Sequence, residues 1–308
     1  MLKVIDLFAG IGGIRLGFDR AFGGVDCVFT SEIDKFAVQT YSANFGDDNI
    51  YGNITEISEQ DVPDHDILLA GFPCQPFSQA GLKKGFSDTR GTLFFDIERI
   101  LLEKKPKAFL LENVKQLKGH DKGRTLQVIL DHLKDAGYVV YYDVLKARDF
   151  GIPQNRERIF IVGFLDHDVK FSFPAPTGTD TRVGSILESE PDDSYTISDR
   201  LWDGHQRRKI QNKLDGKGFG FGLFNADSPY TNTISARYYK DGSEILIDQL
   251  GKNPRKLTPR EAARLQGYPD TYIIPVSNVQ AYKQFGNSVC VPVIEAIAKE
   301  MRKAMKLS

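Results

Sequence analysis

A cysteine flanked by prolines is the residue of this chain best suited to chemistry. Cys74 stands in Gly71-Phe72-Pro73-Cys74-Gln75-Pro76-Phe77-Ser78, directly after the apolar run 65–70. That run predicts a buried strand which the prolines end, so we expect the thiol at the strand's carboxyl end, where open α/β sheets place ligands. A thiol with a pKa of about 8.5 supplies some reactive thiolate near neutrality. Cys74 is therefore a candidate nucleophile, although many free cysteines are small buried hydrophobes.

Two further segments place charged side chains at strand ends. Glu112, in Glu112-Asn113-Val114, follows the predicted strand 107–111 and occupies the position that Cys74 has on its own strand. Arg156 and Arg158 lead into the predicted strand 159–164, where alternate positions share a face. A carboxyl group could donate a proton, and arginines could hold a developing negative charge. A solvated sheet edge would explain the arginines equally well.

The first predicted strand leads into a glycine turn. The segment 6–13 contains Gly10, Gly12 and Gly13 and precedes an amphipathic helix, an arrangement that presents backbone amides to a nucleotide-like ligand. Glu32 ends a second predicted strand, 26–31, about twenty residues later, where an acid can accept hydrogen bonds from ribose hydroxyls. The glycines depart from the G-x-G-x-x-G spacing, so a structural turn and a solvated acid are the alternatives.

The elements that must position these residues form two unequal lobes. Alternating strands and helices up to residue 173 predict a doubly wound α/β domain. From residue 174 the helical periodicity fades, and short β-type runs predict a smaller, strand-rich lobe over 174–256. We assign 257–284 to a hinge segment that opens with a capping box at Thr258, and a tight turn over 284–289 precedes a final helix. Residues 285–308 return to the first lobe.

The composition of the 308 residues is that of an ordinary soluble protein, with 41% hydrophobic and 26% charged residues. An apolar run long enough to span a bilayer is missing, and the chain starts directly with a strand, so we expect a cytoplasmic protein. Three scattered cysteines indicate neither a disulfide framework nor a zinc site. The net charge of −1 means that a nucleic-acid site must be a local basic surface.

The order of these segments resembles a known family. Six segments, taken together in their order along the chain, closely resemble the ordered motifs of the bacterial cytosine-5 DNA methyltransferases of restriction-modification systems. They are 6–13, 71–78, 112–114, 154–160, 255–269 and 284–291. The resemblance covers 1–173 and 255–308. It implies a Rossmann-like domain that binds S-adenosylmethionine and releases S-adenosylhomocysteine, without a metal. It also implies a target-recognition domain, with double-stranded DNA bound between the two.

The resemblance also implies site residues. Cys74 would add to carbon 6 of a cytosine flipped out of the duplex, Glu112 would protonate ring nitrogen 3, and Arg158, helped by Arg156, would hold the carbonyl oxygen. The cofactor would be surrounded by Phe8, Gly10, Ile11, Gly13, Glu32, Ile33, Asn53, Ile54, Pro73, Leu93, Asn287 and Val289. DNA would be contacted by Gln75, Ser78 and Arg90 in the loop after the cysteine and by Thr233, Arg237, Tyr238 and Lys240 in the second lobe.

Two positions depart from the family pattern. Asn53 stands where the family commonly has an acid that accepts from the adenine amino group, and its amide oxygen can accept the same bond. Ala80 stands where some relatives have a polar residue that helps to fill the gap left by the flipped base. The sequence does not show which residue fills that gap in this chain.

Other functions fit parts of the pattern. A methyltransferase with the same motifs could act on tRNA, although the long second lobe and Thr233-Ile234-Ser235-Ala236 favour DNA. A Rossmann-type oxidoreductase or a catalytically silent DNA-binding regulator would use only some of these residues. We expect a monomer that does not bind membranes, and a cognate restriction endonuclease that acts on the same DNA site without binding this chain. The recognition sequence itself cannot be read from the chain.

Overall fold

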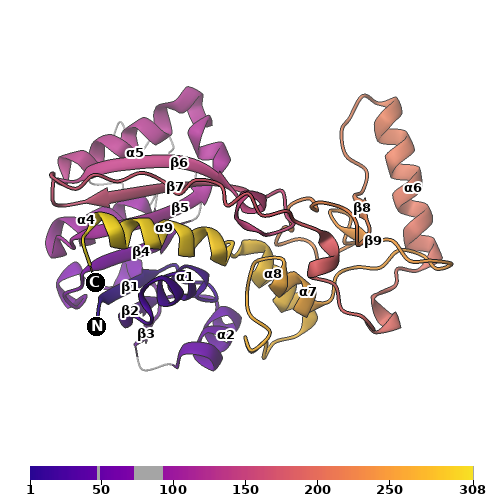
Figure 1. Ribbon diagram of the computed structural model, residues 1–308, viewed down its shortest axis with the longest axis horizontal. Helices are drawn as coiled ribbons and strands as arrows, with labels where there is room; N and C mark the ends of the chain where they lie inside the picture. Colours follow the sequence, from indigo (N-terminus) through magenta and orange to yellow (C-terminus); the bar gives the residue numbers. More distant parts are fainter. Residues whose placement is uncertain (47–48, 73–92, 308) are drawn as a thin grey trace.

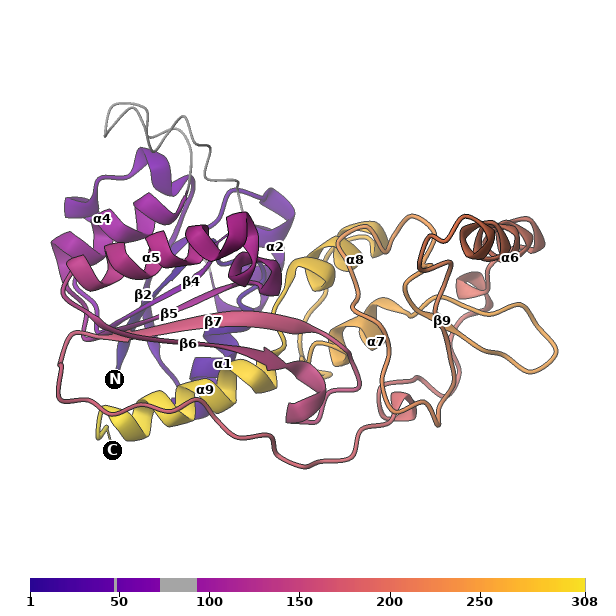
Figure 2. The same cartoon turned by 90° about the horizontal axis from the view of Figure 1, so that it is seen from above.

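A computed structural model describes residues 1–46, 49–72 and 93–307 of the chain. Figures 1 and 2 show a lobe built on a large sheet and a second lobe that carries α6, with α7 and α8 between the two. The strands are β1 (Lys3–Leu7), β2 (Asp26–Ser31), β3 (Ile50–Tyr51), β4 (Ile67–Gly71), β5 (Ala108–Val114), β6 (Val139–Lys146), β7 (Glu157–Phe164), β8 (Leu223–Phe224) and β9 (Leu246–Ile247). The α-helices are α1 (Gly13–Phe22), α2 (Lys35–Phe45), α4 (Phe94–Lys104), α5 (Arg124–Asp135), α6 (Asp199–Leu214), α7 (Pro259–Arg264), α8 (Asn278–Asn287) and α9 (Val291–Ala304).

The large sheet confirms the predicted doubly wound fold. Its seven strands in the described part of the chain lie in the order β3-β2-β1-β4-β5-β7-β6. Strands β1 to β5 run parallel, whereas β7 is antiparallel to both β5 and β6. The order reverses between β1 and β4, which is where open α/β sheets bind their ligands. The predicted strand 26–31 coincides with β2.

Helices cover both faces of this sheet because successive strand residues point to opposite faces. On β4, Ile67 and Leu69 pack with α1 and α9, while Leu68 and Ala70 pack with α4 and α5. The predicted final helix is α9, which returns to the first lobe and lies against α1 (Figure 1). An added Cβ at Gly17 would lie 2.5 Å from Ile294, so these two helices can approach closely only because that residue is glycine.

The second lobe is less regular than the sequence predicted. Its described strands, β8 and β9, have two residues each, and its longest element is the helix α6. The expectation of a strand-rich lobe is therefore wrong. Helix α6 has His205 as its buried residue, so its sequence lacks the apolar stripe that identifies a helix.

The segment 257–284 begins as predicted and ends differently. Thr258 and Glu261 form the capping box of α7, with Pro259 at the first helical position. Residues 284–287, predicted as a tight turn, are instead the last residues of α8, and the chain turns at Ser288. α8 packs with α7, and both share an apolar core with Ile234 and Tyr238 of the second lobe. Within the described residues, none of the helices is long and apolar enough to cross a membrane.

Candidate active site

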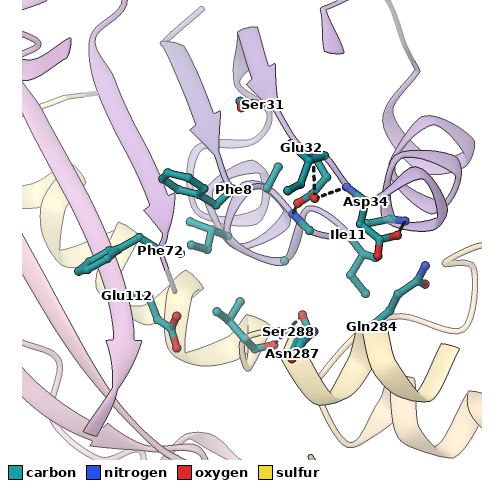
Figure 3. Close-up of a pocket in the computed structure, with 18 of the residues that line it drawn as sticks. Phe8, Ile11, Ser31, Glu32, Asp34, Phe72, Glu112, Gln284, Asn287 and Ser288 are labelled. Atoms are coloured by element: carbon teal, nitrogen blue, oxygen red, sulfur yellow. Dashed lines mark hydrogen bonds between the residues drawn. The ribbon is translucent and has the colours of Figure 1, made fainter. Parts of the chain in front are cut away.

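A cavity of about 480 Å³ opens at the carboxyl ends of the central strands. Figure 3 shows Phe72 and Glu112 at one end of it and Asp34 and Gln284 at the other. Eleven of the twelve residues predicted to surround a cofactor line this cavity. They are Phe8, Gly10, Ile11, Gly13, Glu32, Ile33, Asn53, Ile54, Leu93, Asn287 and Val289. Pro73, the twelfth, lies outside the described residues.

The glycine turn between β1 and α1 allows close packing at the cavity wall. Gly12 has a φ of 76°, a left-handed conformation that glycine adopts without steric cost. A Cβ at Gly13 would lie 2.6 Å from the hydroxyl of Tyr268 and 2.8 Å from Val289, so only glycine fits there. Phe8 adopts a φ of 55° although it has a side chain. Phe8 lines the cavity, and strained backbone of this kind is often retained at functional sites.

Glu32 fixes this turn and still has capacity to bind a ligand. Its carboxylate accepts hydrogen bonds from the backbone amides of Gly10 at 2.7 Å and of Ile33 and Asp34 at 2.8 Å (Figure 3). An ionised carboxylate offers about four acceptor positions. Three are used within the protein, so Glu32 can accept one further hydrogen bond from a ligand hydroxyl.

Asn53 lies beside the cavity at the start of a short 3₁₀ helix, Ile54–Glu56. Its side-chain oxygen accepts from the amide of Thr55 at 3.2 Å, and its side-chain nitrogen donates to Glu56 at 3.0 Å. A carbonyl oxygen has two lone pairs, so the second remains for a donor in the cavity.

The sequence analysis missed several residues of the cavity lining. They include Phe72 and the polar residues Ser31, Asp34, Asn113, Gln280, Lys283, Gln284 and Ser288. Gln284 ties α8 to α2, since it accepts from Thr40 at 2.9 Å and donates to the carbonyl of Phe36 at 2.8 Å. Asn113 donates to the carbonyl of Phe72 at 3.0 Å and so joins the ends of β5 and β4. Both lie in motif segments of the sequence, Gln284 in 284–291 with the predicted site residue Asn287 and Asn113 in 112–114 beside Glu112.

Glu112 and Arg158 form an ion pair at the floor of the cavity. Glu112 lies opposite Phe160, and Val114 lies opposite Arg158, in the antiparallel pairing of β5 with β7. The two charged residues are therefore diagonal neighbours on one face. Nε of Arg158 lies 3.0 Å from a carboxylate oxygen of Glu112, and the side chains are 18% and 12% exposed.

Burial determines the protonation behaviour of Glu112. Desolvation raises the pKa of its carboxyl group, and the charges of Arg158 and Arg156 lower it by less. A carboxyl group with a raised pKa is protonated over more of the neutral range, which suits a general acid.

The structure corrects the expectation that both arginines face the substrate. Arg158 lines the cavity, whereas Arg156 does not. The guanidinium of Arg156, which is 2% exposed, donates to the backbone carbonyls of Ile234, Gly286 and Ser288. Strand β7 begins at Glu157, so Arg156 precedes the region in which alternate residues must share a face.

The predicted DNA contacts fall into three groups. Gln75, Ser78 and Arg90, like Cys74, lie outside the described residues. In the second lobe Arg237 and Lys240 are exposed and Thr233 is half-buried, so all three can be reached from solvent. Tyr238 is 0% exposed, and its hydroxyl donates to the carbonyl of Ile245 and accepts from the amide of Leu257. Tyr238 is therefore a core residue, and its prediction as a DNA contact is wrong.

Asp6 is a buried carboxyl group behind the glycine turn. It is 1% exposed, and neither carboxyl oxygen has a hydrogen-bond partner among the described residues. Burial raises the pKa of Asp6 well above its ordinary value, Arg15 opposes this rise, and the charges of Glu32 and Asp19 add to it. The folded protein therefore holds a proton on Asp6 at pH values where the unfolded chain has lost it.

We expect this proton to make stability depend on pH. Between the ordinary carboxyl pKa of about 3.9 and the raised native pKa of Asp6, the folded state binds more protons than the unfolded state. The free energy of unfolding must then fall as pH rises, by about 1.4 kcal/mol per pH unit within that window. Asp6→Asn is neutral throughout, so its stability relative to the natural protein should increase as pH rises above about 4.

Urea unfolding at several pH values measures this difference. Asp180→Asn is the matched control, because Asp180 is exposed and its substitution should leave the slope unchanged. Equal slopes for the natural protein and Asp6→Asn would show that Asp6 is ionised in the folded state.

Within residues 1–46, 49–72 and 93–307, His, Cys, Asp and Glu side chains form no group of three or more that could hold a metal ion. Fold and cavity together define a doubly wound α/β protein with a ligand site at the carboxyl ends of its strands. A carboxyl–guanidinium pair lies inside that site.

Comparisons with known proteins identify the family within this class. The C-5 cytosine-specific DNA methylase family matches residues 2–303. The chain is 75% identical over 305 residues to the Type II methyltransferase M.NlaX of Neisseria lactamica, covering 99% of this chain and 97% of that protein. It is 66% identical over 310 residues to the Type II methyltransferase M1.ScrFI of Lactococcus lactis subsp. cremoris, covering 99% and 79%.

A solved structure agrees with the fold. A variant of DNMT2 from Spodoptera frugiperda superposes with a TM-score of 0.81 over 98% of this chain and 99% of that one. The identity is 22%, so this likeness bears on the fold alone. The chain belongs to the C-5 cytosine-specific DNA methylase family. It is a DNA methyltransferase that modifies carbon 5 of cytosine, as the resemblance implied, and the tRNA alternative is not favoured.

Proposed function

We propose that the cavity binds S-adenosylmethionine, which supplies the methyl group from its sulfonium. The cavity volume of about 480 Å³ suits a ligand of that size. The free acceptor position of Glu32 would take a ribose hydroxyl, and the free lone pair of Asn53 would take the adenine amino group. The reacting end of the ligand would then point toward Glu112, at the opposite end of the cavity (Figure 3).

We propose that Cys74, Glu112 and Arg158 activate the cytosine. The Cys74 thiolate adds to carbon 6, and Glu112 gives its proton to ring nitrogen 3, so that carbon 5 becomes an enamine carbon able to accept a methyl group. Arg158 holds both the Glu112 carboxyl group and the carbonyl oxygen of the base. Methyl transfer releases S-adenosylhomocysteine. A base, such as water, then removes the carbon 5 proton, the thiolate leaves carbon 6, and the proton on ring nitrogen 3 returns to Glu112, which restores the aromatic ring and the acid.

The ion pair of Glu112 and Arg158 inside the cavity of the glycine turn carries this proposal. Because carbons 5 and 6 are shielded in a stacked duplex, the target cytosine must be flipped out of the helix.

We assign the catalytic lobe to 1–173 with 285–308, the recognition lobe to 174–256 and the hinge to 257–284. The named relatives are Type II methyltransferases. We infer that this protein acts as a cytoplasmic monomer that protects DNA from a cognate endonuclease.

Two measurements on the natural protein test the proposal. Calorimetric titration should detect binding of S-adenosylmethionine and no binding of NAD. Bisulfite sequencing of DNA from cells that express the chain should find one sequence context methylated, with none of that signal from Cys74→Ser. Binding of NAD instead, or methylation scattered over all contexts, would contradict it.

A further inference from the structure

The segment 231–237, which we call the recognition segment, is hydrogen-bonded to residues 153–155, which lead into β7. The amide of Thr231 donates to the carbonyl of Pro153 at 2.8 Å, and the amide of Asn155 donates to the carbonyl of Thr231 at 2.8 Å. The hydroxyl of Thr233 donates to the carbonyl of Asn155 at 2.6 Å. The second lobe is thus joined directly to the strand that carries Arg158.

Two buried side chains hold the peptide groups of Ile234 within this segment. The side-chain oxygen of Gln154 accepts from the amide of Ile234 at 3.1 Å, and the guanidinium of Arg156 donates to the carbonyl of Ile234 at 3.2 Å. Gln154 is 0% and Arg156 2% exposed. Since buried polar groups are costly when unpaired, these bonds strongly favour one position of the segment.

Arg156 also holds the wall of the cofactor cavity. Its other terminal nitrogen donates to the carbonyls of Gly286, at 3.1 Å, and of Ser288. Gly286 and Ser288 both line the cavity. A Cβ at Gly286 would lie 2.3 Å from the backbone of Ser235, so wall and segment are in direct contact.

We propose that Arg156 is a positioning residue that couples cofactor binding to DNA recognition. This inference rests on the proposed function, because it takes the cavity as the cofactor site and the segment as part of the DNA surface. A ligand that orders the 286–288 wall also fixes the guanidinium of Arg156, which in turn fixes Ile234. The recognition segment is then already ordered when DNA binds, so binding loses less conformational entropy and the affinity of the protein for DNA rises.

The three carbonyls explain why an arginine is needed at this position. A guanidinium presents five donors in a rigid planar fork, whereas an ammonium is a compact charge on a flexible stem. Arg156→Lys keeps the charge but cannot span Ile234, Gly286 and Ser288 with the same geometry. Gln154→Met is the matched control, because the Gln154 side chain holds the same Ile234 but its hydrogen bonds within the described residues go to Leu265, Gln266 and Ile234, and not to Gly286 or Ser288.

The test measures the dissociation constant of a duplex carrying the site mapped by bisulfite sequencing, with and without saturating S-adenosylhomocysteine. We expect the product to tighten DNA binding by the natural protein at least about fivefold. Arg156→Lys should reduce that ratio toward one, whereas Gln154→Met should weaken DNA binding and keep the ratio. An unchanged ratio in folded Arg156→Lys, or a ratio of one in the natural protein, would overturn the coupling.

Hydrogen exchange on the natural protein provides a test that needs no variant. S-adenosylhomocysteine alone, without DNA, should slow exchange of the amides in 231–237, including that of Ile234. Unchanged exchange there, with protection at 286–288, would overturn this inference and leave the cofactor site standing. If the product does not bind at all, the proposed function fails as well.

Discussion

We expect the Cys74→Ser variant to bind duplex DNA and S-adenosylmethionine and to transfer no measurable methyl group. A serine hydroxyl is almost entirely protonated near neutrality, whereas a thiol is a few per cent ionised and intrinsically far more nucleophilic. Without addition at carbon 6, carbon 5 of cytosine cannot attack the sulfonium. Single-turnover assays with radiolabelled methyl groups, together with binding titrations, measure the two effects separately.

Cys290→Ser is the matched control for this substitution. Cys290 is 5% exposed and lies in the core beside α9, and burial raises the pKa of its thiol to about 12. Its loss should leave methyl transfer intact in folded protein. Turnover by Cys74→Ser at a rate near that of the natural protein would end the assignment of Cys74 as nucleophile.

We expect Glu112→Gln to lower the rate of methyl transfer by about 10² to 10⁴ with little change in cofactor affinity. Glutamine preserves the size of the side chain but cannot give a full proton to ring nitrogen 3. It also removes the ion pair with Arg158. Because the ligand site at Glu32 lies at the other end of the cavity, binding of S-adenosylmethionine should be largely retained.

The pH profile distinguishes an acid role from a structural one. If protonated Glu112 is needed, the single-turnover rate of the natural protein should fall as pH rises through its raised pKa, and this limb should disappear in Glu112→Gln. Glu103→Gln, an exposed carboxyl group on α4, is the control. An unchanged rate in Glu112→Gln would remove the acid role.

The first lobe could be predicted well from the sequence because local patterns determine it. Strand β2 coincides with the predicted run, since a buried strand between turn signals is recognisable within a few residues. The glycine turn and Glu32 met at one cavity because parallel strands bring their carboxyl ends to one edge of the sheet. The motif order then indicated which residues share that edge.

The errors arose where distant contacts decide the structure. Arg156 donates to carbonyls that are 78, 130 and 132 residues away along the chain. The spacing between Arg156 and Arg158 in the sequence does not predict these distant contacts. Tyr238 follows an arginine and precedes a tyrosine and a lysine, yet its burial depends on Ile245 and Leu257. Helix α6 lies at the far end of the second lobe (Figure 1) and has His205 as the buried residue among its 16, so hydrophobic periodicity could not reveal it.

Covalent trapping of Cys74 tests most directly whether this residue is the nucleophile. A duplex with 5-fluorocytosine at the target position cannot lose fluorine as a proton would be lost, so elimination should stop after methyl transfer. In the presence of S-adenosylmethionine we predict a stable protein–DNA adduct that peptide mass spectrometry locates at Cys74, and no adduct in Cys74→Ser. No adduct under conditions where the unmodified duplex is methylated, or an adduct at another residue, would contradict the account.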